Sequence, residues 1–593
     1  MKPTSQSEDA SSMQSSARAR WLDTFRELDA QLPSNQHVDV DIDQTRARID
    51  AEVIGIRALL SAMNERRNQF ALPSKLPPEV LAHIFLTLCL DVDPVTSQSS
   101  SNPRNPVWLP VAHVCRRWRH ICIDRAPSWM ALSLNWGPLW DDIVEQERGR
   151  QLWIEGYAGR GVYTKDRIDA ILGQQHRLRS LALRDVPGDH LQRLLLGFMD
   201  PGIPLDRLSL RTSPESDGEM PNLHPQLLSN AVNLRSMDLT HVAIPRGAAA
   251  SSFSNLAHFT IRFPRAESSQ LVPNKHSFAE MTSILRVMPV LETLTVVNAL
   301  EHYTPDSQIP DIQLPHLVYL EIRTEDISCW HLWLHLHVPP TATIVVDGNN
   351  LVEPALEPLI ISKLCAHINE PRAPRFPICF VQNGNAGYLG FELTEEALSG
   401  DADGEGSDIG TGTVRRKEPS RITMQLFCYD AGRILQQIVH DASLDTVEHL
   451  GISGDNWDDD MFYDAFISLQ SVTTLHLDVR DSAGECLQAL APAHARRGRT
   501  RAPEGEATLF PALARLRCTS VHFDDPRSRS IVNQYALETV IEDRAKDPCT
   551  ALAQLDIMGC DVRFDWVERW RSFVGVLNWD FYEGSLEESD EEE

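Results

Sequence analysis

The sequence predicts a mixed α/β fold in which a small helical module is followed by an irregular α/β solenoid. Two observations lead to this prediction: a pair of amphipathic helical segments between residues 75 and 122, and an apolar motif that recurs along most of the remaining chain. Recurrence at a roughly constant interval is typical of repeat arrays. The 593 residues would otherwise correspond to about four compact domains of ~150 residues each.

The N-terminal 72 residues divide into two parts. Residues 1–44 are rich in Ser, Gln and Asp and are predicted to be mostly disordered, apart from an amphipathic stretch at Trp21–Leu28. Residues 45–72 predict an amphipathic helix whose apolar residues have coiled-coil spacing; they are Ile49, Val53, Ile56, Leu60, Met63 and Phe70. Arg67 occupies the one missing position of this series. Packing of the helix on the next domain is favoured, and a dimer through residues 45–70 is the alternative.

Residues 73–130 carry the most informative pattern. A helix is predicted to begin at Pro77 and Pro78, where a missing N–H costs nothing, with Glu79 at its positive end. Its apolar face consists of Val80, Leu81, Ile84, Phe85 and Leu88. A polar loop at 91–107 leads to a second helix, whose apolar face consists of Val111, Val114, Cys115, Trp118, Ile121 and Cys122. Arg116, Arg117 and Arg119 are predicted to lie off that face.

Three ordered motifs in this segment resemble an F-box domain of the kind found in large fungal families. They are LPPEVLAHIF at 76–85, VCRRWRHI at 114–121 and APSWMAL at 126–132. The resemblance implies docking on a Skp-family adaptor and, through it, membership of a cullin-RING ubiquitin ligase.

The resemblance also implies which residues contact the adaptor: Leu76, Pro77, Pro78, Val80, Leu81, Ile84, Phe85, Val114, Cys115 and Trp118. Some of these side chains are expected to form the small core instead, Trp118 and Leu88 foremost. A module of this size buries little apolar surface alone, so a partner is expected to cover the rest.

The region from 131 to 580 repeats the pattern apolar-x-x-apolar-x-apolar. It occurs as Leu178-Leu181-Leu183, Leu205-Leu208-Leu210, Leu234-Met237-Leu239, Leu256-Phe259-Ile261, Leu291-Leu294-Val296, Leu317-Leu320-Ile322, Val447-Leu450-Ile452, Val472-Leu475-Leu477, Leu513-Leu516-Cys518 and Leu552-Leu555-Ile557. The first six start 22 to 35 residues apart, near the leucine-rich-repeat period. We therefore predict an irregular leucine-rich-repeat-like domain, with each motif on a short strand of a parallel sheet.

Many repeats have no recognisable helix between the motifs, although Thr282–Met288 and Asp464–Leu469 are candidate helical fragments. Strand-like runs at Thr343–Val346, Ile378–Val381 and Ile422–Phe427 indicate that the array continues through the motif-free stretch 323–446. Residues 395–421 and 481–508 are predicted to be disordered insertions, and residues 581–593 an acidic tail.

Composition restricts the partners and the compartment. The formal net charge is −28, which argues against nucleic-acid binding because phosphate neutralisation needs a basic face. The sequence contains no run of 18 apolar residues, so no membrane span is predicted. The first twenty residues are polar, so no secretory signal is expected. The 11 Cys are scattered without a CxxC pair, which favours a reducing environment, cytoplasmic and/or nuclear.

The sequence predicts neither a catalytic site nor a metal site. His331, His335 and His337 alternate with apolar residues, which favours a half-buried segment over a metal site. The glycine run at 384–387 lacks the strand–helix context of a phosphate loop. No nucleophile with its base can be nominated, and neither a cofactor nor a metal is expected.

The sequence therefore favours a non-enzymatic, substrate-recruiting subunit of an SCF-type ubiquitin ligase. The F-box would hold the adaptor, and the repeat domain would hold a target protein whose identity is unknown. One alternative is an interaction scaffold outside any ligase. A less favoured alternative is an enzyme in the α/β region.

Overall fold

The structure is a computed structural model that describes most of the chain in segments. The described residues are 6–31, 42–90, 111, 113–125, 131–134, 151–156, 165–198, 202–212, 220–245, 253–264, 275–303, 310–395, 421–480, 482–491, 508–523 and 533–581. They form two units that divide between residues 126 and 127. The predicted loop 91–107, almost all of the predicted insertion 395–421 and of the predicted acidic tail, and residues 481 and 492–507 of the predicted insertion 481–508 lie outside the described residues. The remainder of 481–508 is not a disordered insertion: Ala483–Leu490 forms a helix whose apolar residues, Cys486, Leu487 and Leu490 among them, are buried.

Unit 1 is helical. Its elements are α1 (Gln6–Asp29), α2 (Ile42–Gln69), the 3-10 turn η1 (Leu72–Lys75), α3 (Pro78–Leu90) and α5 (Arg116–Arg125). Helix α2 coincides with the helix predicted for 45–72, and α3 and α5 coincide with the two amphipathic segments that follow. The segment predicted to be mostly disordered contains the 24-residue helix α1, which includes the amphipathic stretch Trp21–Leu28.

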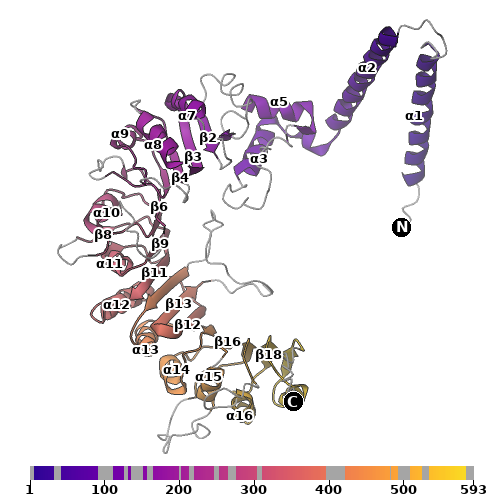
Figure 1. The fold of residues 1–593 in the computed structure, drawn as a ribbon. Helices are drawn as coiled ribbons and strands as arrows, with labels where there is room; N and C mark the ends of the chain where they lie inside the picture. The colour runs from indigo at the N-terminus through magenta and orange to yellow at the C-terminus, as the bar shows by residue number, and fades with distance from the viewer. Residues whose placement is uncertain are drawn as a thin grey trace, which may run out of the picture. The chain divides into compact units, whose positions relative to one another are not determined.

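Unit 2 is built on a 17-stranded, mostly parallel sheet (Figure 1). Its strands, in spatial order, are β1 (Ala131–Ser133), β2 (Leu152–Gly156), β3 (Leu178–Val186), β4 (Arg207–Thr212), β5 (Ser236–Thr240), β6 (His258–Arg262), β7 (Thr293–Val297), β9 (Tyr319–Thr324), β11 (Thr343–Leu351), β14 (Arg421–Phe427), β13 (Tyr388–Thr394), β12 (Ile378–Asn383), β15 (His449–Ser453), β16 (Thr474–Asp478), β17 (Arg515–Thr519), β18 (Gln554–Met558) and β19 (Val576–Trp579). A separate parallel pair joins β8 (Ile312–Gln313) to β10 (Leu336–His337).

Short helices connect successive strands and lie along one side of the sheet (Figure 1). They are α7 (Lys165–Leu172), α8 (Gly188–Gly197), α9 (Pro225–Asn230), α10 (Phe278–Leu285), α11 (Ser328–His335), α12 (Glu357–Ile368), α13 (Ala431–Asp441), α14 (Asp459–Phe466), α15 (Ala483–Leu490), α16 (Asn533–Ala545) and α17 (Phe564–Trp570), with 3-10 turns η5 (Gln175–Arg177) and η7 (Asn385–Gly387). The two predicted helical fragments overlap α10 and α14, each of which begins four or five residues earlier. The other helices were not predicted, although α13 carries a clear helical period in its buried residues Ala431, Ile434, Leu435, Ile438 and Val439.

The ten recurring motifs occupy ten strands of this sheet. In each motif the second and third apolar residues lie on the strand and are buried, as Leu208 and Leu210 of β4 are at 1% exposure. The two residues face the helices because alternate side chains of a strand point to the same side. The prediction that the motifs form parallel strands is therefore confirmed.

The sheet is continuous through the motif-free stretch 323–446. The three predicted strand-like runs lie in β11, β12 and β14, in agreement with the prediction. Strand β13 was not predicted, and it runs antiparallel to both β12 and β14. These two antiparallel pairings reverse the local strand order, so that β14 pairs with β11 and β12 pairs with β15.

One residue lies between the second and third apolar residues of each motif, and it faces the side of the sheet without helices. Several of these residues carry a charge. Asp556 of β18 is the most buried of them, at 1% exposure. Its carboxylate accepts hydrogen bonds from Arg515 at 2.6 Å, Gln554 at 2.8 Å and Asn578 at 2.7 Å. Burial alone would raise the pKa of Asp556, but these hydrogen bonds outweigh it and hold the pKa below the ordinary value.

This network predicts an acid-dependent stability difference for Asp556→Asn. At neutral pH the substitution should destabilise unit 2 by about 2 kcal/mol, because charge-assisted hydrogen bonds are lost. Because the folded pKa is depressed, the carboxylate stabilises the fold above its unfolded pKa near ~3.9, and this contribution is lost as pH falls through the folded value. The difference in melting temperature between wild type and variant should therefore shrink below about pH 4 and vanish once the pH is below the folded pKa. A gap that stays constant with pH would contradict the role assigned to the carboxylate.

Candidate functional site

Helix α3 positions most of the predicted adaptor-contacting residues. Leu76 precedes the helix in extended backbone (φ −69°, ψ 141°), Pro78 is its first residue, and Glu79 lies in the first turn. Proline at the first position fits because the first N–H groups of a helix have no intrahelical acceptor. The Leu-Pro-Pro sequence thus fixes where the helix begins.

The side chains of α3 divide into three faces at helical spacing. Leu81, Ala82 and Phe85 form the buried face, with exposures of 1%, 9% and 1%. Glu79 and His83 are exposed and form a polar face. Between these faces lies the α3 strip, which consists of Pro77 just before the helix, Val80 and Ile84; Val80 is 42% exposed and Ile84 is 39% exposed.

The ten predicted adaptor-contacting residues therefore fall into separate environments. Pro77, Pro78, Val80, Ile84 and Val114 are exposed. Leu76, Cys115 and Trp118 are half-buried, whereas Leu81 and Phe85 belong to the core. Accordingly, the exposed five are available to a partner in unit 1 as it stands, and Leu81 and Phe85 are not.

The core of this module joins α3 to α5. The rings of Phe85 and Trp118 lie 5.0 Å apart between centroids, and Ile121 is 6% exposed. Trp118 thus contributes to the core, as expected, although it remains half-buried rather than fully buried. The side chain of Leu88 lies outside the described residues.

Arg117 is a positioning residue that the sequence patterns did not single out. It lies off the apolar face of α5, as predicted, and its guanidinium donates a 2.6 Å hydrogen bond to the carbonyl oxygen of Leu76. A neighbouring hydrogen bond of 3.3 Å joins Arg116 to Glu65 of α2. Arg117 therefore fastens α5 to the backbone immediately before the α3 strip.

We expect Arg117→Ala to loosen the start of α3 by about 1 kcal/mol, because it removes one charged but exposed hydrogen bond. Faster hydrogen–deuterium exchange at the α3 amides would measure this effect. Arg117→Lys keeps the charge and one donor, so its exchange rates should fall between those of wild type and Arg117→Ala. Unchanged exchange in Arg117→Ala would contradict the fastening role.

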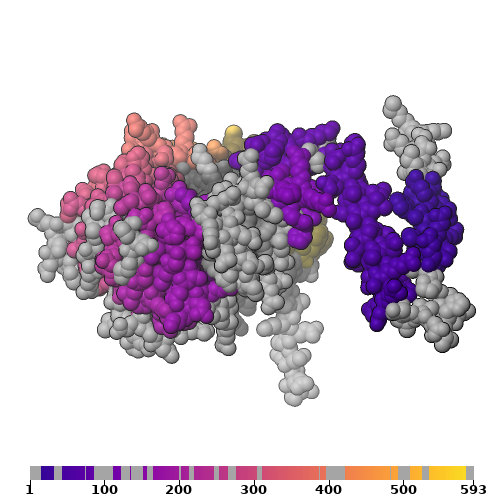
Figure 2. Space-filling model, turned by 90° about the horizontal axis from the view of Figure 1, so that it is seen from above, coloured from indigo at the N-terminus to yellow at the C-terminus, as the bar shows by residue number. Residues whose placement is uncertain are grey.

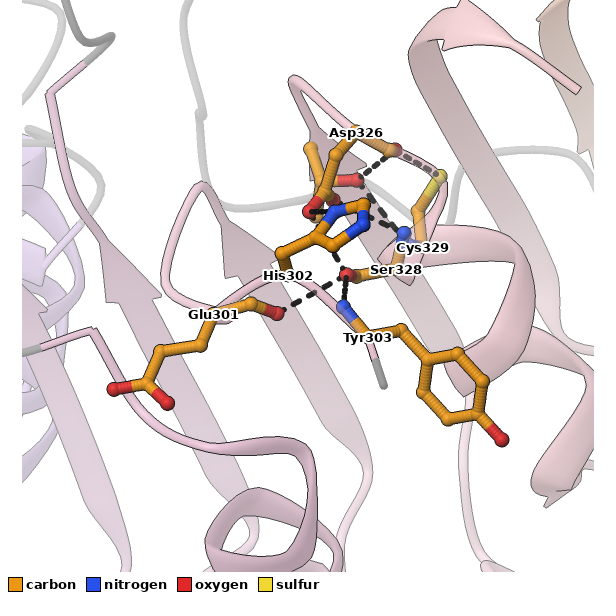
Figure 3. Close-up of polar contacts among 7 residues, drawn as sticks. Glu301, His302, Tyr303, Asp326, Ser328 and Cys329 are labelled. Atoms are coloured by element: carbon orange, nitrogen blue, oxygen red, sulfur yellow. Dashed lines mark hydrogen bonds and ion pairs between the residues drawn. The ribbon is translucent and has the colours of Figure 1, made fainter. Parts of the chain in front are cut away.

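Among the described residues of unit 2, a serine, a histidine and an aspartate form a cluster at the start of α11 (Figure 3). His302 Nδ1 lies 3.1 Å from Oδ2 of Asp326, and Ser328 Oγ lies 3.0 Å from the same oxygen. Ser328 Oγ also lies 3.1 Å from the Glu301 carbonyl oxygen and accepts a 3.0 Å hydrogen bond from the Tyr303 backbone N–H. Activation of a serine requires its hydroxyl to donate to a base such as histidine. Here the carboxylate contacts both groups, and the cluster fastens the 301–303 segment to the start of α11.

Several cysteine thiols of unit 2 are also unsuited to nucleophilic chemistry. Burial raises the pKa of Cys329 and of Cys428 to about 12 and that of Cys365 to about 11. A thiol needs a lowered pKa to be reactive near neutral pH. These three cysteines are therefore protonated packing residues.

The three histidines of the α11 region are spread over different environments. His331 stacks on Tyr303, with 3.6 Å between ring centroids, and burial lowers its pKa. His335 is half-buried and His337 is exposed. Within the part of the chain that the structure describes, no group of three or more His, Cys, Asp or Glu could hold a metal ion. Among the same residues, no helix has the length and hydropathy needed to cross a membrane.

Comparison with known proteins bears on the helical module. Residues 73–135 match the F-box-like family model, a segment that contains α3, α5 and all ten predicted adaptor-contacting residues. This match supports an F-box protein. F-box-like domains in general serve as adaptors in SCF ubiquitin ligases and bind Skp-family proteins. A search of curated proteins finds no match to the chain.

Proposed function

We propose that the protein is a non-enzymatic substrate-recruiting subunit of an SCF-type ubiquitin ligase, of the fungal F-box type. The observation that carries this proposal is the α3 strip inside the F-box-like segment. The core of this short two-helix module contains Leu81, Phe85 and Trp118. Val80 and Ile84 of α3 nevertheless remain exposed to solvent. An exposed apolar strip on a helix suits docking into a groove of a Skp-family adaptor.

Unit 2 supplies the surface for a target protein in this proposal. We interpret its strand–helix array as an irregular leucine-rich-repeat-like solenoid whose helix-free face is open to a ligand. Ion pairs lie on that face at strands β5, β6 and β9. Arg262 lies 3.8 Å from Asp238 and 3.9 Å from Glu321, and Arg323 lies 2.9 Å from Glu321. Charged side chains held in fixed positions favour a specific protein target.

Recruitment accelerates ubiquitin transfer by proximity and needs no catalytic residue from this chain. A target bound to unit 2 would be held near the charged enzyme at high effective concentration. The site of action under this proposal is the cytoplasm and/or the nucleus.

Co-purification of the full chain with a Skp-family adaptor and a cullin tests the proposal. We expect all three proteins in one complex of fixed stoichiometry. Recovery of the adaptor without the cullin would instead favour the alternative that the protein is an interaction scaffold outside any ligase. Failure of the purified wild-type chain to bind the purified adaptor would overturn the proposal.

A further inference from the structure

Helix α2 carries an apolar seam along its length that is exposed in unit 1. The seam consists of Ile49, Val53, Ile56, Leu60 and Met63, and the exposed fraction ranges from 38% at Val53 to 58% at Leu60. In the space-filling view, α2 forms part of the indigo surface of the chain (Figure 2). Five apolar residues in one exposed row on a 28-residue helix call for a covering surface.

The spacing of the seam indicates what kind of surface covers it. The residues follow one another at intervals of four and three, which is a 3.5-residue period. A straight helix has 3.6 residues per turn, so a strict heptad row drifts by about 20° per heptad unless the helix supercoils around another helix. The partner is therefore a helix with the same period, rather than the flat side of a folded domain.

Helix α1 matches the seam less well than a second α2 does. Its large apolar residues, Trp21, Phe25 and Leu28, extend over about 10 Å at a 1.5 Å rise per residue, and the row continues toward the N-terminus only with Ala17 and Met13. The α2 seam from Ile49 to Met63 extends over about 21 Å and carries a branched or long apolar residue at every position.

We propose that α2 pairs with α2 of a second copy of this chain in an antiparallel coiled coil. The direction follows from two arginines, Arg46 and Arg67, which continue the row at the positions equivalent to Val53 and Leu60. A parallel pair would place Arg46 against Arg46 and Arg67 against Arg67, which is repulsive. In an antiparallel pair the two arginines are kept apart; in the register described below, Arg46 lies opposite Met63, over which its stem can extend.

One antiparallel register satisfies the charges beside the seam. When Val53 lies opposite Ile56 of the second copy, Asp50 lies opposite Arg57 on both sides of the pair, as opposite charges flanking a seam should. Shifting by one heptad in either direction brings Asp50 against Asp50 or Arg57 against Arg57. The favoured register also overlaps the helices from residue 42 to residue 67, nearly the whole of α2.

The mass of the full chain in solution tests the pairing. Light scattering after size exclusion should give twice 66.7 kDa at micromolar concentration. Leu60→Asp should raise the dimer dissociation constant at least 100-fold, whereas the control Ile54→Asp, which lies off the seam at 66% exposure, should change it less than threefold. A monomeric wild-type chain, or equal effects of the two variants, would overturn the proposal; circular dichroism verifies that both variants keep their helices.

Charge reversal tests the direction. Asp50→Arg and Arg57→Asp should each weaken the dimer about tenfold, and the double variant should restore it, because the pair is re-formed with its signs exchanged. In a parallel dimer Arg57 would face Glu52, so the double variant would stay weak, and that result would overturn the antiparallel arrangement. Phe25→Asp in α1 should leave the dimer unchanged; a loss would mean that α1 forms part of the dimer contact and would overturn the pairing of α2 with α2.

Discussion

Replacing both Val80 and Ile84 with aspartate should lower the affinity for a Skp-family adaptor at least 100-fold. Each substitution would bury an unpaired carboxylate in an apolar contact, at a cost of at least about 2 kcal/mol, and a tenfold change in affinity corresponds to about 1.4 kcal/mol. The free protein should fold normally, because the two side chains are 42% and 39% exposed and the new charges stay hydrated. Aspartate at position 80 lies in the first turn of α3, where a negative charge is favourable.

Calorimetric titration of the purified chain with the purified adaptor measures this loss. Ile54→Asp is the matched control, since it introduces the same charge at a more exposed isoleucine of α2, outside the α3 strip. Its affinity should equal that of wild type within about twofold. If Val80→Asp/Ile84→Asp bound the adaptor as wild type does, the α3 strip would not be the contact, and the F-box-like segment would have to bind through another face.

The choice of Val80 and Ile84 depends on information that the sequence alone did not contain. The sequence groups Val80, Leu81, Ile84 and Phe85 on one wide apolar face, and the family resemblance assigns all four to the adaptor. In the structure the same face is divided, because α5 packs over the side of α3 that carries Phe85 and leaves the other side open. The position of a second helix around the first is a tertiary property, which periodicity within one helix cannot specify.

The strands of unit 2 were predictable for a simpler reason. Each motif encodes a strand locally: two apolar residues separated by one position face the helices, and the preceding apolar residue fills the turn. Leu205, Leu208 and Leu210 are all nearly completely buried in this way. Such a pattern depends on neighbouring residues alone, so it survives the irregular spacing between repeats.

Strand β13 and the reversed strand order around it could not be predicted from the recurring motif. The run Tyr388–Thr394 lacks the recurring motif, although its buried residues Leu389, Phe391 and Leu393 alternate with Gly390, Glu392 and Thr394 as in a strand with one buried face. Its antiparallel pairing with β12 follows from the tight turn between them, and its antiparallel pairing with β14 joins two strands that residues 395–420 separate in the chain. The glycines at 384 and 387, which the sequence excluded from phosphate binding without giving them another role, belong to the turn that makes this reversal.

Gly387→Ala should destabilise this part of unit 2 by about 3 to 5 kcal/mol. Gly387 has a φ of +76°, and a Cβ atom there would lie 2.0 Å from the carbonyl oxygen of Cys428. That neighbour is backbone and cannot rotate away, because the Cys428 N–H donates a 2.9 Å hydrogen bond to the Gly387 carbonyl oxygen. The substitution therefore adds a backbone clash to the ordinary cost of a left-handed alanine, about 1 to 2 kcal/mol, and falls among the rare strongly destabilising changes.

Gly202→Ala separates the two contributions. Gly202 has nearly the same φ, +75°, but no atom lies within 4 Å of the position that its Cβ would take. Gly202→Ala should therefore lower the free energy of unfolding only by the cost of a left-handed alanine, about 1 kcal/mol. The difference between the two variants in denaturant unfolding measures the cost of the clash.

If the two variants lost equal stability, the turn at 385–387 would have room to move away from Cys428. Strands β12, β13 and β14 would then be a flexible connection between the two parallel halves of the sheet, and a target could not bind rigidly across them. A larger loss for Gly387→Ala, with faster amide exchange in β12, β13 and β14, would mean that the reversed strands hold both halves in one register, as a single target-binding face requires.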